Sequence, residues 1–139
     1  MRLELTAFTR RGAALAARLA EELTRRGHQA ACTRGAGESA ADWTAQAFGR
    51  AQGLIFVGAA GIAVRSIAPH LRHKSTDPAV VVVDERGQFA IPILSGHLGG
   101  ANDLAREIAA LLGGQAVITT ATDVNGAFAV DQWARAQGL

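Results

Sequence analysis

Two patterns of apolar residues alternate along the chain. One is a short continuous run, and the other is a spacing that places apolar residues on one face of a helix. Leu54–Val57 and Ala79–Val83 are continuous apolar runs, which is typical of strands buried on both faces. Leu15, Leu19 and Leu23 recur four residues apart, as expected for one face of a helix. The chain therefore carries both kinds of element.

The predicted strands and helices follow one another in turn. Strands are expected at Leu3–Phe8, Gln29–Thr33, Leu54–Val57, Ala79–Val83, Gln88–Leu94 and Ala116–Thr119. Helices are expected at Gly12–Arg26, Ala40–Gly49, Ile62–Leu71, Asn102–Leu112 and Val124–Gly138. This alternation predicts an α/β three-layer sandwich, with a mostly parallel sheet and helices on both faces. The turn Asp84–Gly87 leaves open a hairpin between the two strands that flank it.

Length and composition narrow the class of protein. We expect residues 1–139 to form a single α/β domain, although a boundary near Gly53 stays open. Cys32 is the only cysteine, so an intrachain disulfide is excluded and a reducing cytoplasm is expected. No apolar run is long enough to span a bilayer, and the net charge is only +2. We expect neither a membrane nor nucleic acid as a partner.

The most distinctive motif joins the strand ending at Leu94 to the helix starting at Asn102. It reads Ser95-Gly96-His97-Leu98-Gly99-Gly100-Ala101-Asn102. Glycines let a backbone approach a ligand closely, and a strand-to-helix turn presents free N–H groups. The motif therefore predicts a binding turn, with a glycine-rich helix cap as the plainer alternative.

Three turns would lie at one edge of the sheet if their strands are parallel. They are Gly58-Ala59-Ala60-Gly61, Ser95-Gly96-His97 and Thr119-Thr120-Ala121-Thr122-Asp123. Ligands of open α/β sheets bind beyond the carboxyl ends of the strands, so a site is expected there. The first turn lacks the Gly-x-Gly start of a dinucleotide fingerprint and the Lys-Ser/Thr of a P-loop. Tight packing and ligand contact both remain open for it.

A cationic segment lies between the first turn and the second. Arg65, Arg72 and Lys74 carry its charge, and arginine suits carboxylates because its planar fork makes paired charge-assisted bonds. A solvated surface loop is the alternative. His70 and His73 have a spacing compatible with two metal ligands, but no clear third ligand is near, so no protein-held metal is expected.

Catalytic chemistry is expected from the second and third turns. His97 is the candidate general base because imidazole titrates near neutrality. Ser95 would donate to a developing oxyanion and Asp123 would orient the imidazole, although Gly-x-Ser-x-Gly is absent. A purely structural His97, bonded to backbone, stays open.

Several blocks in the same order resemble the N-terminal part of the CbiG family, the cobalt-precorrin-5A hydrolases of cobalamin biosynthesis. These blocks are Gly61-Ile62-Ala63-Val64-Arg65, Thr76–Asp84, Leu94–Asn102 and Ile118–Asp123. They lie within the run from Leu54 to Trp133, which is more than half of the chain, whereas the first fifty residues fit loosely. Members usually continue into a middle region and a C-terminal domain.

The resemblance implies an enzyme that opens the δ-lactone of cobalt-precorrin-5A with water, releasing acetaldehyde and leaving cobalt-precorrin-5B. Cobalt would arrive in the substrate, so no cofactor is expected, and the family's C-terminal domain or another pathway enzyme is an expected partner. Contacts with the substrate are expected from Gly58, Gly61, Arg65, Arg72, Lys74, Gly96, Gly99, Gly100, Asn102 and Thr120.

Two other functions stay open. One is a non-catalytic module that binds or carries a corrinoid. The other is a small α/β domain that binds an anionic metabolite at its glycine turns. Acetaldehyde release distinguishes a hydrolase from a carrier, and binding of a cobalt-precorrin distinguishes both from the third function.

Overall fold

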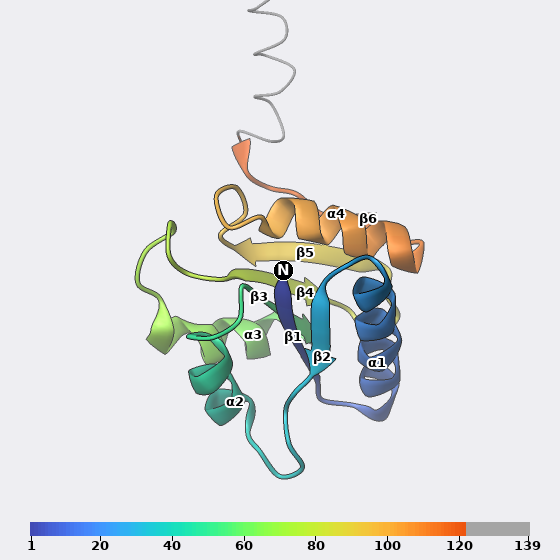
Figure 1. Cartoon of the computed structure of the whole chain (residues 1–139), viewed down its shortest axis with the longest axis horizontal. Helices are drawn as coiled ribbons and strands as arrows, with labels where there is room; N and C mark the ends of the chain where they lie inside the picture. The colour runs from blue at the N-terminus through green and yellow to red at the C-terminus, as the bar shows by residue number, and fades with distance from the viewer. Residues whose placement is uncertain (122–139) are drawn as a thin grey trace, which may run out of the picture.

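The computed structural model describes residues 1–121, which form a single sheet with helices packed against it (Figure 1). The strands are β1 (Arg2–Ala7), β2 (Gln29–Cys32), β3 (Gly53–Val57), β4 (Ala79–Val83), β5 (Phe89–Leu94) and β6 (Gln115–Ala116). The helices are α1 (Arg10–Arg25), α2 (Ala40–Ala47), α3 (Ala60–Ile67), the 3-10 turn η1 (Ala68–His70) and α4 (Ala101–Leu112).

The sheet has the strand order β2-β1-β3-β4-β5-β6. The first four strands are mutually parallel, β5 runs antiparallel to β4, and β6 runs parallel to β5. A tight turn joins β4 to β5, in which the Gly87 amide donates to the Asp84 carbonyl at 2.8 Å. The Phe89 amide donates to the Asp84 carboxylate at 2.7 Å. The hairpin left open by the sequence is therefore present.

Helices cover both faces of the sheet, which confirms the three-layer α/β sandwich (Figure 1). On one face α1 and α4 bury Leu19, Leu23 and Ile108 against β1, β3 and β4. On the other face α2 and α3 bury Trp43 and Ile67 against β3 and β4. Since both faces are covered, the central strands carry apolar side chains at consecutive positions, as their sequences predict.

Local chemistry sets the ends of the helices. Thr9 caps α1, and its hydroxyl accepts the amide hydrogen of Gly12 at 3.0 Å. The helix predicted over Ile62–Leu71 is shorter, because α3 ends at Ile67 and continues only as the 3-10 turn that contains Pro69. Pro69 has no amide hydrogen to donate to the Arg65 carbonyl, so the α-helical hydrogen bonds stop at Ala68, whose own amide still donates to the Val64 carbonyl. β6 is also shorter than predicted, with two residues.

The hairpin changes which turns share an edge of the sheet. Leu94, at the end of β5, pairs with Val80 near the start of β4, whereas Val83 at the end of β4 pairs with Ala90. Ser95 therefore lies at the edge where the parallel strands begin. The prediction that all three turns converge was wrong, because Gly58 follows β3 at the opposite edge.

Two predictions of the sequence concern residues outside the described range. They are the helix at residues 124–138 and the position of Asp123. Within residues 1–121, no helix combines the length and apolar character needed to cross a membrane.

Candidate functional site

The candidate site lies at the edge where β4 begins and β5 ends. A cavity of about 400 Å³ is lined by Lys74, Ser95, Gly96, His97, Leu98 and Thr120. These residues come from three segments that precede β4, follow β5 and follow β6. The sheet therefore brings together a cation, an imidazole and two hydroxyl side chains that are far apart in sequence.

A compact turn over residues 95–100 presents His97 and Leu98 to solvent. The Ala101 amide donates to the Ser95 carbonyl at 3.1 Å, and the Asn102 amide donates to the Gly96 carbonyl at 3.0 Å. The chain closes so tightly that a Cβ at Gly99 would lie 2.5 Å from Ser95 Cβ. Leu98 is 67% exposed at the tip of the turn. These bonds and the close approach of Gly99 to Ser95 fix the backbone of the turn.

Positive φ angles occur on both sides of His97. Gly100 has a φ of +85°, a conformation that side chains rarely adopt, and it begins α4 as its N-cap. Ser95 has a φ of +55° although it carries a side chain.

Asn102 and Thr120 lie behind the turn. Asn102 is buried, and its side-chain amide donates to the Thr120 hydroxyl at 2.9 Å. This bond joins the start of α4 to the segment that follows β6. The second and third predicted turns are therefore adjacent, as far as the described residues show.

Asp77 organises the cationic loop that precedes β4. Its buried carboxylate accepts the Arg72 amide hydrogen at 3.0 and 3.2 Å, one distance for each oxygen. The Asp77 amide donates to the His73 carbonyl at 2.8 Å. On the other side, the Ser95 hydroxyl donates to the Asp77 carbonyl at 3.0 Å. Asp77 thus contacts both the cationic loop and the turn that carries His97.

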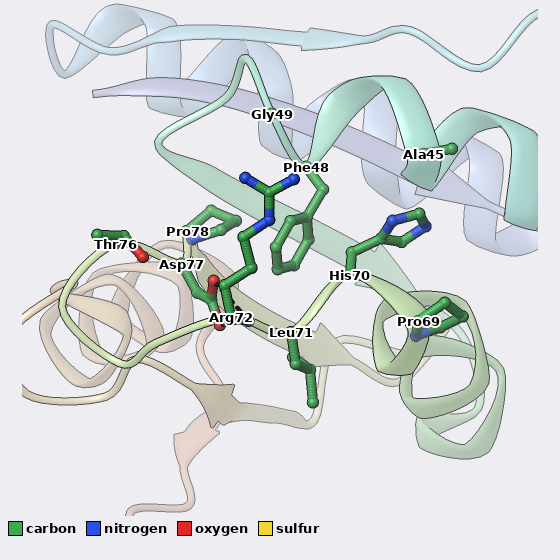
Figure 2. A pocket seen from close by; sticks show the side chains of 10 residues that line it. All are labelled: Ala45, Phe48, Gly49, Pro69, His70, Leu71, Arg72, Thr76, Asp77 and Pro78. Carbon is green, nitrogen blue, oxygen red and sulfur yellow. Dashed lines mark hydrogen bonds between the residues drawn. The ribbon is translucent and has the colours of Figure 1, made fainter.

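A second cavity of about 470 Å³ also borders this loop (Figure 2). Phe48, Gly49, His70, Arg72 and Pro78 are among the residues that line it. The Phe48 and His70 rings lie 5.7 Å apart between centroids, and the Arg72 guanidinium extends toward the Phe48–Gly49 side (Figure 2). A cation beside apolar walls suits a ligand that carries both a carboxylate and hydrocarbon.

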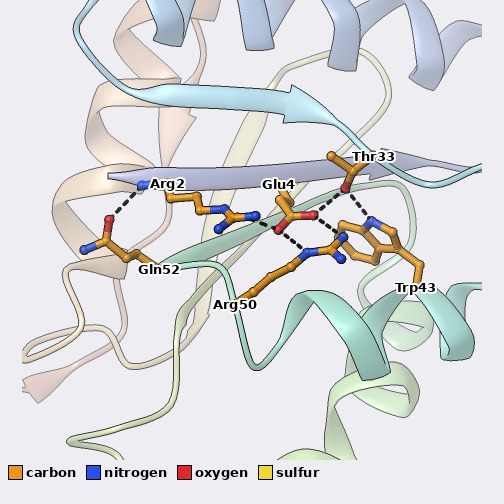
Figure 3. Close-up of polar contacts among 6 residues, drawn as sticks. All are labelled: Arg2, Glu4, Thr33, Trp43, Arg50 and Gln52. Atoms are coloured by element: carbon orange, nitrogen blue, oxygen red, sulfur yellow. Dashed lines mark hydrogen bonds and ion pairs between the residues drawn. The ribbon is translucent and has the colours of Figure 1, made fainter.

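An ion pair between a buried carboxylate and an exposed arginine holds the segment that follows α2 beside this cavity (Figure 3). Glu4 in β1 is 3% exposed, and its carboxylate accepts two hydrogen bonds from Arg50 at 2.7 and 2.8 Å. Its other donor is the Thr33 hydroxyl at 2.6 Å, which in turn accepts the Trp43 indole N–H at 2.8 Å. The Arg50 bonds hold the pKa of Glu4 below its usual value, against burial, which raises it. Gly49, next to Arg50, is thereby fixed in the cavity wall.

The structure does not bring every predicted site residue to this edge. Gly58 and Gly61 lie at the opposite edge, where α3 begins. Arg65 is exposed on α3 and lines neither cavity. His70 contacts Phe48, whereas His73 contacts Ser75, so the two histidines do not form a pair. Asp123 lies outside the described residues.

Sequence reasoning missed Asp77, Phe48 and Leu98 as parts of the site. Asp77 had a usable signal, because Asp side chains bond backbone amides in turns and Pro78 follows it directly. Phe48 and Leu98 had none, since an aromatic residue near a helix end and an apolar residue in a loop are common packing positions.

Comparison with known proteins places this chain in a family. The sequence model of the family described as Cobalamin synthesis G N-terminal, CbiG_N, matches residues 42–123, more than half of the chain. The chain therefore belongs to the CbiG N-terminal family. The matched range includes both cavities and the turn that carries His97.

Relatives of this chain have names that agree with this placement. A cobalt-precorrin-5A hydrolase of Salmonella typhimurium is 60% identical over 86 residues, which cover 62% of this chain and 24% of that protein. One of Priestia megaterium is 52% identical over 87 residues, covering 63% of this chain and 23% of that protein. The chain thus matches about a quarter of the length of these curated relatives.

A solved structure supports the fold over a longer range. A cobalamin biosynthesis protein G homologue from Sulfolobus solfataricus superimposes with a TM-score of 0.73 and 25% sequence identity. The match covers 85% of this chain and 36% of that chain. Strands and helices before residue 42 therefore share the family's architecture, although the family's sequence model does not reach them.

Proposed function

We propose that this chain acts in cobalamin biosynthesis as the N-terminal part of a cobalt-precorrin-5A hydrolase. The reaction adds water to the δ-lactone of the macrocycle and releases acetaldehyde, leaving cobalt-precorrin-5B. The observation that carries the proposal is that 86 residues of this chain align with a hydrolase of that name at 60% identity. The family match spans the turn and both cavities.

The proposed substrate is an anionic tetrapyrrole with acetate and propionate side chains, which suits the charges of this edge. Lys74 lines the cavity beside His97, and Arg72 lines the cavity beside Phe48. Ammonium and guanidinium groups bind carboxylates through charge-assisted hydrogen bonds. Exposed Leu71 and Leu98 offer apolar contact to the macrocycle nearby. Cobalt belongs to the substrate, and we propose no resident cofactor.

We assign the role of general base to His97. The tightly closed turn exposes its imidazole beside the cavity, where it can take a proton from the attacking water. Backbone N–H groups around Gly99 and Gly100 are the proposed donors to the oxyanion of the opening lactone. Asp123 is proposed to orient the imidazole. The Ser95 hydroxyl donates to the Asp77 carbonyl instead of facing the cavity as a donor.

The enzyme is proposed to act in the cytoplasm. A C-terminal domain, in the same chain or as a separate partner, is proposed to complete it. The names of the relatives favour a hydrolase over an anionic-metabolite domain. A carrier module is an outcome of the test below.

The test is anaerobic incubation with cobalt-precorrin-5A and measurement of acetaldehyde, with and without the C-terminal part of a full-length relative. Substitution His97→Gln should lower turnover by about 10²–10⁴-fold, which is the range for a lost general base. Substrate binding should be preserved. His28→Gln is the matched control, because His28 pairs with Glu107 away from both cavities. Binding without acetaldehyde in every combination would make the chain a carrier, and wild-type turnover in His97→Gln would refute the assignment of the base.

A further inference from the structure

Ser95 has a backbone conformation that a residue with a side chain rarely adopts. Its φ is +55°, and among the described residues it is the only non-glycine with a positive φ. Such a conformation persists only where the surrounding contacts determine it. Strained backbone of this kind concentrates at functional sites, so the contacts that maintain it matter for function.

Three contacts maintain the conformation of Ser95. Its carbonyl accepts the Ala101 amide at 3.1 Å, its Cβ packs against the bare α-carbon of Gly99, and its hydroxyl donates to the Asp77 carbonyl at 3.0 Å. The first two lie within the turn itself. The third contact reaches across to the loop that precedes β4.

The direction of that third hydrogen bond is fixed by chemistry. A carbonyl oxygen only accepts, so the hydroxyl hydrogen of Ser95 points at Asp77 and is not available to a substrate oxyanion in this conformation. A serine used as nucleophile would instead need an adjacent base to accept that hydrogen. The hydroxyl thus has a structural partner in place of a reacting one.

Asp77 carries the connection onward to the cationic loop. Its carboxylate accepts the Arg72 amide through both oxygens, and its own amide donates to the His73 carbonyl. Lys74 lies inside this closed loop and lines the cavity with His97. The position of Lys74 relative to His97 is therefore set across the Ser95–Asp77 bond.

We propose that Ser95 is a positioning residue, whose hydrogen bond to Asp77 locks the carboxylate-binding loop 72–77 in register with the turn that carries His97. The inference rests on the proposed function for its catalytic meaning. The structural part of the inference, that one hydrogen bond joins the two loops, rests on the contacts described above.

The first test measures amide hydrogen exchange by NMR in the chain without substrate. In Ser95→Ala, exchange should accelerate about two- to tenfold at both Ala101 and Arg72, the effect of losing one neutral hydrogen bond. The Leu19 amide in the core helix α1 should be unchanged. Ser75→Ala is the matched control, because within residues 1–121 Ser75 hydrogen-bonds to His73 of the same loop and not to the turn that carries His97, and it should leave Ala101 unchanged.

Two further variants keep the proposal testable if Ser95→Ala folds poorly. Ser95→Gly removes the hydroxyl and also the strain, so the turn should fold while exchange at Arg72 still accelerates. Ser95→Asn should restore protection at Arg72, because asparagine tolerates positive φ and its amide can donate to the Asp77 carbonyl. Unchanged exchange at Arg72 in Ser95→Gly would overturn the proposed lock, whether or not Ser95→Ala folds.

Activity of the full-length enzyme separates positioning from catalysis. If Ser95 positions the loop, Ser95→Gly should change kcat and KM, and Ser95→Asn should return both toward the wild-type values. Loss of an oxyanion donor predicts a fall in kcat of about 10²–10³-fold in all three variants, with exchange at Arg72 unchanged, and this result would also overturn the proposal. If no variant and no wild type releases acetaldehyde, the proposed function fails while the exchange data still decide on the lock.

Discussion

Substitution Arg50→Ala tests whether the ion pair of the buried Glu4 carboxylate supports the fold beside the second cavity. It leaves that carboxylate in the middle of β1, with the Thr33 hydroxyl at 2.6 Å and the Arg2 guanidinium at 3.9 Å as its remaining partners. Breaking a fully buried pair costs about 3–5 kcal/mol, because one charge remains without its partner. The Arg50 side chain is 38% exposed, so water can reach the vacated position and screen the charge. We therefore expect a loss of about 2 kcal/mol in the free energy of unfolding.

The assay is thermal and urea unfolding followed by circular dichroism. A loss of about 2 kcal/mol corresponds to a fall in Tm of about 6 °C for a domain of this size. Arg106→Ala is the matched control, since Arg106 pairs at 3.1 Å with Asp103, which is 90% exposed. That exposed pair should contribute no more than about 0.5 kcal/mol. Equal, small effects of the two substitutions at pH 6 would refute the assigned role of Arg50.

The pH dependence of the free energy of unfolding tests the same ion pair independently. The folded protein holds the pKa of Glu4 below its value in the unfolded chain, chiefly through the Arg50 bonds. The stability contributed by Glu4 is therefore present above its unfolded pKa of about 4.3 and is lost as pH falls through the lower folded pKa. Arg50→Ala should shrink this acid dependence, so wild type and variant should differ less at pH 3 than at pH 6.

Three further predictions concern the site and the core. Arg72→Ala and Lys74→Ala should each weaken cobalt-precorrin binding by about 1.5–3 kcal/mol and reduce its salt dependence. The effect of Arg65→Ala should be smaller. Anaerobic titrations at two salt concentrations measure both quantities. Unchanged affinity in the first two variants would identify the loop as plain surface. Gly99→Val should abolish binding in a protein that circular dichroism shows to be folded, because a Cβ there would lie 2.5 Å from Ser95 Cβ, and normal affinity would contradict the closed turn. Leu19→Ala should cost about 2–5 kcal/mol by urea unfolding, since Leu19 is fully buried, and a cost under 1 kcal/mol would argue against the assigned core.

Hydrophobic patterning predicted most of the fold for identifiable reasons. Ala79–Val83 is β4 without a change at either end, because five consecutive apolar residues can only be satisfied between two layers of helices. The leucines of α1 likewise identify its buried face. The direction of β5 was harder to predict, since a hairpin and a crossover are both compatible with a short polar turn. That single ambiguity placed Gly58 and Gly61 at the wrong edge.

Polar residues inside the fold account for what patterning missed. Glu4 stands at an alternate position of a strand and resembles a solvent-facing residue, yet α2 and Arg50 cover that face. The expectation of helices on both faces already implied that Glu4 would need a partner. Asp77 and the φ of Ser95 depend on a contact between loops eighteen residues apart, which no local pattern encodes.

The hairpin restricts where insertions and deletions can occur during evolution. The cationic loop precedes β4 and the His97 turn follows β5, so the length of the hairpin sets how many residues separate them, and the Ser95–Asp77 bond then joins them. One residue added to either strand would shift the register and turn the following side chains to the other face, unless a further bulge like the one between Val80 and Val81 took it up. By contrast, the connections around β2 and α2 can lengthen at small entropic cost. The stretch from residue 72 to residue 102 should therefore evolve at constant length while the N-terminal third drifts, which agrees with a family sequence model that begins at residue 42.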